Sequence, residues 1–282
     1  MVTVSQADVN SFINKTLPPL PGSAMHVVSL LQDINTSTRA IADAVGRDPM
    51  LTAKILRAAN SPLYVSQRNV ISLPKAVLTL GNQAIYLLVI SFTAFDAFAQ
   101  EIRTSIIGCS IWEHSLAVAL TAREIGLTLK LRNSEELFTC GLLHDIGRLL
   151  FLRHDPQFYT QIDNKLSETA ILEVEQNFYG FTHAQVGALA MNRWGLPVEV
   201  AQIVANHHAA GDQNNEFATE TMIINAADEL INARSYDTSA AEIANQLVMN
   251  ESVAALKLSV EQIENILEKT ESGLRELIQI LS

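Results

Sequence analysis

The chain has 282 residues, of which 48% are hydrophobic and 17% charged, so it can bury a substantial core in one large domain or two modest ones. Its formal net charge of -11 argues against binding to nucleic acid or to an anionic membrane through a broad basic surface. The two cysteines, Cys109 and Cys140, form no CxxC pair, which argues against a disulfide framework and a zinc–thiolate site. No signal-peptide pattern begins the sequence, and its most apolar stretch, 84–94, is too short to span a bilayer, so we expect a cytoplasmic protein.

Helical start and stop signals recur along the chain, whereas the alternation typical of strands does not. In the first third, Asp48 can cap a helix that begins at Pro49, where a missing N–H does no harm, and that ends at 60–62. Ser72 can cap a short helix that ends at Gly81, and an apolar helix over about 82–99 follows it.

The rest of the chain has the same punctuation. We expect one helix over 112–125 with Gly126 beyond its end, and another that starts at Ser134 and carries both His144 and Asp145. Capping signals predict further helices, over 182–194, 197–208, 219–233 and from 259 onward. The sequence therefore predicts an all-α fold with short loops.

The candidate functional residues are unevenly distributed, which indicates a division into three parts. Residues 1–105 form an N-terminal helical subdomain that contains one histidine, His26, and no cluster of metal-ligand type. Residues 106–235 hold all the candidate ligands, and 236–282 are expected to form a C-terminal helical extension that packs back on the first part. The acids Asp212 and Glu216 are interpreted as solvated loop residues rather than ligands.

Residues of metal-ligand type are concentrated in the second part, in or beside the predicted helices. They are His114, His144, Asp145, His183, His207, His208 and Asp228. Imidazole and carboxylate ligands without thiolates suit iron, manganese, zinc or nickel. One or two such divalent ions can activate water for attack on a phosphate ester.

Four of these residues come from three predicted helices: His114, His144, Asp145 and Asp228. Side chains from different helices can reach one ion in the interior of a helical bundle, and Asp145 could also bridge two ions. The alternative is a polar remnant in which the four groups bond only to one another. Burying that many ionisable groups together in an apolar bundle without a metal is costly.

The other candidates each have two interpretations. His183 is either a metal ligand or an exposed residue of a first helical turn. At least one of His207 and His208 should point inward, while the other can act as a cation at a helix C-terminus. Arg148 can bind a phosphate bidentately or pair with a surface carboxylate.

Several longer motifs occur in a fixed order along the chain. They are 17–21 (LPPLP), 48–61 (DPMLTAKILRAANS), 71–77 (ISLPKAV), 112–115 (WEHS), 141–147 (GLLHDIG), 194–197 (WGLP) and the pair at 207–208. Over roughly residues 15 to 235 the chain thus resembles the HDOD domain family of bacterial signalling proteins. The resemblance implies an all-α, multi-helix HD-superfamily bundle with an N-terminal helical subdomain. It also implies a role in signal transduction, with other signalling proteins as partners.

HDOD domains are related to HD-type phosphohydrolases, and many have lost the metal-binding residues. By resemblance, this chain retains the ligand pattern of the HD and HD-GYP phosphodiesterases. The first histidine of that pattern corresponds to His114 and the last aspartate to Asp228. The residues that match the HD pair and the ligands of a second metal are His144, Asp145, His183, His207 and His208.

Two departures from the HD-GYP pattern bear on activity. No Gly-Tyr-Pro motif follows His207-His208, and Arg148 stands where that pattern has a lysine. Both departures argue against hydrolysis of cyclic di-GMP.

Two functions therefore remain open. The first is a metal-dependent phosphohydrolase acting on a nucleotide or cyclic nucleotide, with Asp145 and Arg148 as catalytic residues. The second is a non-catalytic regulatory module that contacts other proteins and whose metal or ligand site is structural or sensory.

Overall fold

A computed structural model of the protein describes residues 6–33, 35–61, 70–162, 166–209, 216–233, 239–247 and 249–281. Throughout these ranges the regular elements are helices, and none of the described residues belongs to a strand. The prediction of an all-α fold is confirmed.

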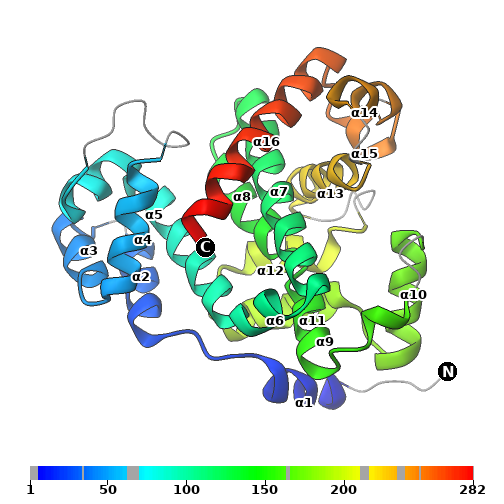
Figure 1. Ribbon diagram of the computed structural model, residues 1–282, viewed down its shortest axis with the longest axis horizontal. Coiled ribbons are helices and arrows are strands. Elements are labelled where there is room, and N and C mark those ends of the chain that lie inside the picture. Colours follow the sequence, from blue (N-terminus) through cyan, green and yellow to red (C-terminus); the bar gives the residue numbers. More distant parts are fainter. Residues whose placement is uncertain are drawn as a thin grey trace. The chain divides into compact units, whose positions relative to one another are not determined.

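The chain folds into two compact units, which we name the small unit (19–97 with 269–282) and the large unit (1–18 with 98–268). The small unit contains α2 (Gly22–Gln32), α3 (Thr38–Val45), α4 (Pro49–Ala59), α5 (Leu73–Ala97) and the last part of α16 (Val260–Leu281). Figure 1 shows these helices in blue, cyan and red. The three-part division made from the sequence stays a prediction about how segments of the chain fold.

Local signals set the helix ends of the small unit. The Asp48 carboxylate accepts hydrogen bonds from the backbone N–H groups of Met50 and Leu51, and Pro49 is the first residue of α4, as predicted. Gly81 interrupts α5 with φ 81° and ψ 162°, a conformation open mainly to glycine, so the predicted break is confirmed. By length and composition α5 is apolar enough to cross a membrane, but 61% of its most apolar window is buried within the protein, as in a core helix.

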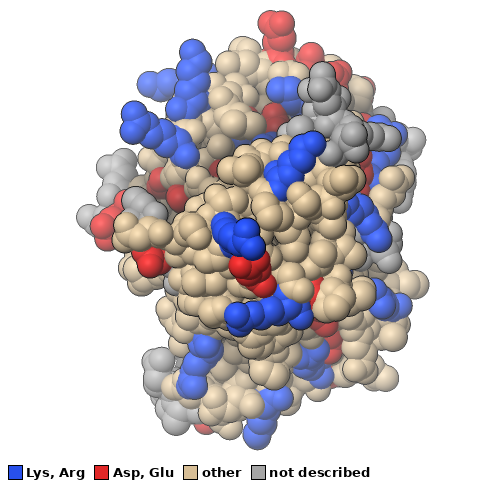
Figure 2. Space-filling view, turned by 90° about the vertical axis from the view of Figure 1, so that its left-hand side faces the viewer, with Lys and Arg blue, Asp and Glu red and all other residues tan. Residues whose placement is uncertain are grey.

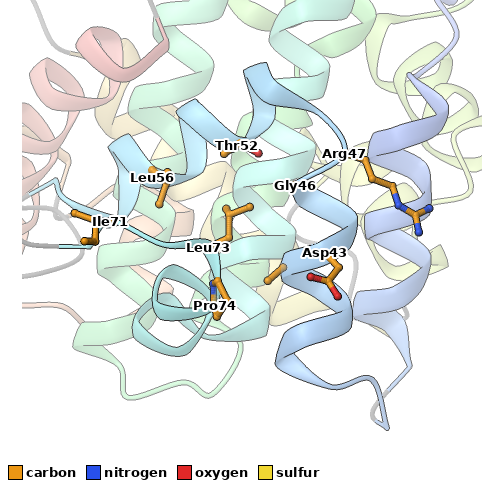
Figure 3. Close-up of a pocket in the computed structure, with 9 residues that line it drawn as sticks. Asp43, Gly46, Arg47, Thr52, Leu56, Ile71, Leu73 and Pro74 are labelled. Atoms are coloured by element: carbon orange, nitrogen blue, oxygen red, sulfur yellow. The ribbon is translucent and has the colours of Figure 1, made fainter.

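A surface cavity of about 500 Å³ lies between α3, α4 and the start of α5 (Figure 3). Its lining residues are Ala42, Asp43, Gly46, Arg47, Thr52, Leu56, Ile71, Leu73 and Pro74. Figure 3 shows the larger apolar side chains on one side and the two charged ones on the other. Ile71 is 83% exposed, and Leu78 and Met50 are also mostly exposed. The cavity lining is therefore largely apolar, and its described residues include no cluster of metal-ligand type.

The large unit is built around α7 (Ile106–Thr128), which packs along α8 (Ser134–Leu143) and α13 (Ala218–Asn232). Its other helices are α1 (Gln6–Thr16), α6 (Ala99–Thr104), α9 (Ile146–His154), α10 (Glu168–Tyr179), α11 (His183–Arg193), α12 (Val198–Asn206), α14 (Ala240–Leu247), α15 (Glu251–Ala255) and the first part of α16, with a 3-10 turn at Tyr159–Gln161. The capping box predicted for α11 is present, formed by Thr182 and Gln185.

One predicted helix end is wrong. Gly126 lies inside α7, not beyond its end. A Cβ there would lie 2.7 Å from Leu137 Cδ1, so this glycine serves the close packing of α7 on α8 rather than the end of a helix. A glycine is required at this position, but the reason is the packing of two helices and not the end of one.

A second correction concerns His144 and Asp145, which do not lie within one helix. α8 ends at Leu143 with His144 as its C-cap, and Asp145 is the N-cap of α9. Asp145 has φ -98° and ψ 11°, which turns the chain between the two helices. Both side chains therefore come from a helix junction.

Candidate metal centre

Five segments of the large unit supply the predicted ligands. They are α7 for His114, the α8–α9 junction for His144 and Asp145, the first residue of α11 for His183, the end of α12 for His207 and His208, and α13 for Asp228. The structure brings all seven together. They form two groups that share Asp145, which we name position A (His114, His144, Asp145 and Asp228) and position B (Asp145, His183, His207 and His208).

At position A the polar atoms lie at distances suited to a shared ion. His114 Nε2 is 2.9 Å from Asp228 Oδ1, and His144 Nε2 is 3.5 Å from Asp145 Oδ2 and 4.0 Å from Asp228 Oδ1. Nitrogen and oxygen ligands about 2.0–2.2 Å from one ion lie roughly 3–4 Å from each other. Asn232, one turn along α13, donates to Asp228 Oδ1 at 2.9 Å and fixes that carboxylate.

Position B is assembled around the other oxygen of Asp145. Asp145 Oδ1 is 3.2 Å from His183 Nε2 and 3.9 Å from His207 Nε2. His183 Nε2 is also 2.9 Å from His208 Nε2. Since Oδ2 faces position A and Oδ1 faces position B, the one carboxylate links the two groups.

Unpaired buried atoms test whether the site suits a metal. His144 Nε2 and His207 Nε2 are buried and make no hydrogen bond. The Nδ1–H groups of His144 and His207 face the carbonyl oxygens of Gly141 and Val204 at 2.7 Å, which leaves their Nε2 lone pairs directed at the cluster. Buried polar groups without partners are costly, so a hydrogen-bonded remnant does not account for these atoms, whereas metal ligation does.

The protonation states also fit metal binding. Burial lowers the pKa of His144 despite the nearby carboxylates. Burial, His144 and His183 lower the pKa of His207 to about 3, and burial with His207 and His183 lowers that of His208 as well. These three imidazoles are therefore neutral at pH 7, the form that binds a cation.

The carboxylates stay ionised. Burial raises the pKa of Asp145, but Arg148 and His144 outweigh it and hold the pKa well below its ordinary value. For Asp228 burial is likewise outweighed, here by the hydrogen bond from His114. Without a metal, burial and Arg148 lower the pKa of His183, but Glu175 and Asp145 raise it to about 9 overall, so an ion bound at position B would displace a proton.

Arg148 pairs with carboxylates of the site rather than of the surface. Its Nε lies 3.0 Å from Asp145 Oδ1, and its guanidinium also pairs with Glu168. Burial lowers the pKa of Arg148, but Asp145 and Glu168 hold it well above its ordinary value. The side chain is thus a fixed positive charge at the edge of position B.

The segment 159–179 contains functional residues that the sequence reading missed. Glu168 and Glu175 lie on α10, where no helix was predicted, and Tyr159 lies in the 3-10 turn Tyr159–Gln161. The start signal at Ser167 and the left-handed Gly180 after the last helical residue could have revealed this helix. The direction of its carboxylates could not be read from the sequence.

Gly147 brings position B together. A Cβ at this residue would lie 2.1 Å from the backbone oxygen of His183. Only glycine lets α9 lie this close to the first turn of α11, and this contact holds His183 beside Asp145.

The alternative placements of the histidines can now be decided. His183 is fully buried, so its interpretation as an exposed residue is wrong, and His207 and His208 both point into the cluster. Glu216 is exposed, as expected of a loop acid, and Asp212 lies outside the described residues.

The chain is a helical bundle with a cluster of histidines and aspartates, and its fold is HD-like. A family model, HDOD domain, matches residues 17–210, and the chain belongs to this family. A solved structure from Shewanella amazonensis SB2B, described as a candidate phosphohydrolase, is similar with a TM-score of 0.78, 21% identity and coverage of 98% of each chain. An HDOD domain protein of unknown function from Geobacter sulfurreducens has a TM-score of 0.72 and 23% identity, covering 98% of this chain and 95% of that one.

One curated relative is much longer than this chain, and its description states no activity. An uncharacterized protein of Treponema pallidum (strain Nichols) is 22% identical over 200 residues, which are 68% of this chain. The matched part is 37% of that relative, so the chain corresponds to little more than a third of it. Identities this low support a shared fold only, so the description of the site depends on the geometry of its residues in this structure.

Proposed function

We propose that this protein is a metal-dependent phosphohydrolase of bacterial signalling that acts on a nucleotide or cyclic nucleotide. The observation that carries the proposal is that two buried imidazole nitrogens without a hydrogen bond, His144 Nε2 and His207 Nε2, lie beside the Asp145 carboxylate among further histidines. A hydrogen-bonded remnant leaves these atoms unexplained.

In this proposal positions A and B each hold a divalent transition ion, with iron, manganese, zinc or nickel suited to the donor set. Such an ion, when bound, supplies an acidified water and offsets charge on a phosphate. Asp145 would contribute one carboxylate oxygen to each position. His114 is the least buried of the four position A ligands, with 20% of its side chain exposed, so substrate approaches from its side.

Arg148 orients the substrate anion. Its guanidinium offers several donors in one plane, which suits a phosphate group. Glu168, its partner, is 26% exposed and can leave this ion pair when a phosphate takes its place. Asp145 retains the other side of the guanidinium and fixes its direction.

The test is a screen of phosphodiesters and phosphomonoesters with protein reconstituted with each of the four metals. We expect turnover that is lost in Asp145→Ala and kept in His26→Ala, which removes an exposed histidine of the small unit. Absence of bound transition metal after reconstitution, or activity that survives Asp145→Ala, contradicts the proposal.

A second candidate function is supported by the small unit. Its apolar cavity and the exposed Met50, Ile71 and Leu78 are features of a surface that contacts other signalling proteins. In that case the ions stabilise or report a state of the protein. Metal binding without turnover across the whole screen would favour this second function.

A further inference from the structure

The histidine ligands differ in what holds their outer ring nitrogen. His144 and His207 direct Nδ1 at backbone carbonyls, whereas His183 directs Nδ1 at the carboxylate of Glu175, at 2.8 and 3.0 Å from its two oxygens. A carboxylate behind a metal-binding histidine orients the ring and increases the basicity of the nitrogen that faces the metal. Position B therefore contains a ligand with a charged support.

Glu175 is fully buried and makes no contact with the cluster other than through His183. It accepts hydrogen bonds from the His183 backbone N–H at 2.8 Å and from the Tyr159 hydroxyl at 2.7 Å, besides the ring contact. Three donors thus converge on one carboxylate. The three hydrogen bonds compensate for the burial of this negative charge, so the carboxylate is held in place by its surroundings.

We propose that Glu175 is a positioning residue that fixes the tautomer and orientation of His183 and so sets the metal affinity of position B without touching the ion. The inference rests on the proposed metal site and adds that its two positions are held by different means.

An ionised carboxylate can only accept hydrogen bonds, so the His183 nitrogen that faces it carries a proton. With Nδ1 protonated, a neutral ring has its lone pair on Nε2, which faces Asp145 Oδ1 at 3.2 Å. In Glu175→Gln one oxygen must serve the three donors, the NH₂ group can turn toward Nδ1 and reverse the tautomer, and the negative charge is lost. Each change weakens His183 as a ligand and leaves position A alone.

The test is a stepwise titration of metal-free protein with Zn²⁺ against a competing chelator, with each step assigned by His114→Ala for position A and His208→Ala for position B. We expect Glu175→Gln to weaken position B by about 10–100-fold, the usual cost of losing such a partner, with position A unchanged. The matched control is Glu173→Gln, which removes an exposed carboxylate from the same helix and should change neither affinity.

A double-mutant comparison separates positioning from general damage. Because Glu175 acts through His183, Glu175→Gln should have no further effect on metal affinity once His183→Ala is present. Thermal unfolding of each variant verifies folding, and Glu175→Asp, which keeps the charge, replaces the glutamine variant where that one does not fold. Glu175→Asp should weaken metal binding at position B less than His183→Ala does.

Three results decide the matter. Loss of affinity at position B alone supports the inference. Unchanged affinity at both positions, or an equal loss at both, overturns it while the proposed metal site stands. Wild-type protein that binds no Zn²⁺ removes the proposed function and the inference together, so the two failures are distinguishable.

Discussion

The two units of this protein differ in charge and in the kind of surface they offer. The large unit has 24 Asp and Glu against 11 Lys and Arg, a formal charge of -13, while the small unit has 6 against 8, a charge of +2. Six of the seven histidines belong to the large unit. The net charge of the whole chain is therefore the sum of two unlike parts.

This difference suits the large unit to metal-dependent chemistry and the small unit to contact with other proteins. The acidic large unit attracts cations and holds a cluster of ligands, whereas the described residues of the small unit form an apolar cavity without such a cluster. On the face drawn in Figure 2 the Lys and Arg side chains are scattered and form no continuous basic surface. The second function proposed above would therefore depend on the apolar surface of the small unit.

The largest effect should come from Asp145, since both positions use it. Asp145→Ala should abolish binding of both ions and lower any phosphohydrolase activity by about 10³-fold or more, because the metal supplies several kcal/mol of stabilisation. Elemental analysis and the rate measurement check this. Retention of two ions by the variant would contradict the proposed role of Asp145 in both positions, and the difference between the units would then not depend on this residue.

Gly147→Ala should have the next largest effect. The added methyl group meets the His183 backbone, so we expect a loss of about 1–3 kcal/mol in unfolding free energy and weaker metal binding at position B. Gly22→Ala in the small unit is the control, because nothing lies within 4 Å of its Cβ position. Denaturant unfolding of metal-free protein measures both, and equal stability of Gly147→Ala and wild type would contradict the close approach.

The pH dependence of metal-free protein should also originate in the large unit. The folded pKa of His183 is raised to about 9, so its contribution to stability is full below its unfolded pKa of about 6.5 and is lost as pH rises through 9. The folded pKa of His207 is lowered to about 3, so the unfolded state takes up protons first and stability falls from about pH 6.5 downward. Melting temperatures between pH 6.5 and 9 should vary less in His183→Gln than in wild type, and identical slopes would contradict this.

The smallest effect is expected from the small unit. Ile71→Ser changes an exposed side chain at the cavity, so stability should change by less than about 0.5 kcal/mol and metal content not at all. Thermal unfolding and elemental analysis test this. A loss of bound metal in Ile71→Ser would show that the two units are not separate in function.

The parts of the fold that local chemistry determines were predictable from the sequence. The cap at Asp48, the break at Gly81 and the capping boxes at 182–185 and 259–262 all occur as expected, because each depends on residues close together in the chain. Gly126 misled because its signal comes from packing against another helix. The junction was missed because only two residues, His144 and Asp145, separate α8 from α9.

The site was predictable in kind and not in arrangement. Residue types and a family resemblance indicated the seven ligands, but their convergence depends on contacts between distant helices. The pairing of Arg148 with Glu168 and the support of His183 by Glu175 could not be foreseen, because α10 itself was not predicted. Outer contacts of a site carry little sequence signal of their own.

The central claim is that one carboxylate, that of Asp145, joins two metal positions in the large unit. Anomalous X-ray diffraction from crystals grown with Zn²⁺ or Mn²⁺ tests it most directly. We predict two anomalous peaks on either side of the Asp145 carboxylate, one facing His144 and one facing His183. Crystals in which no peak lies among the seven residues would contradict the account.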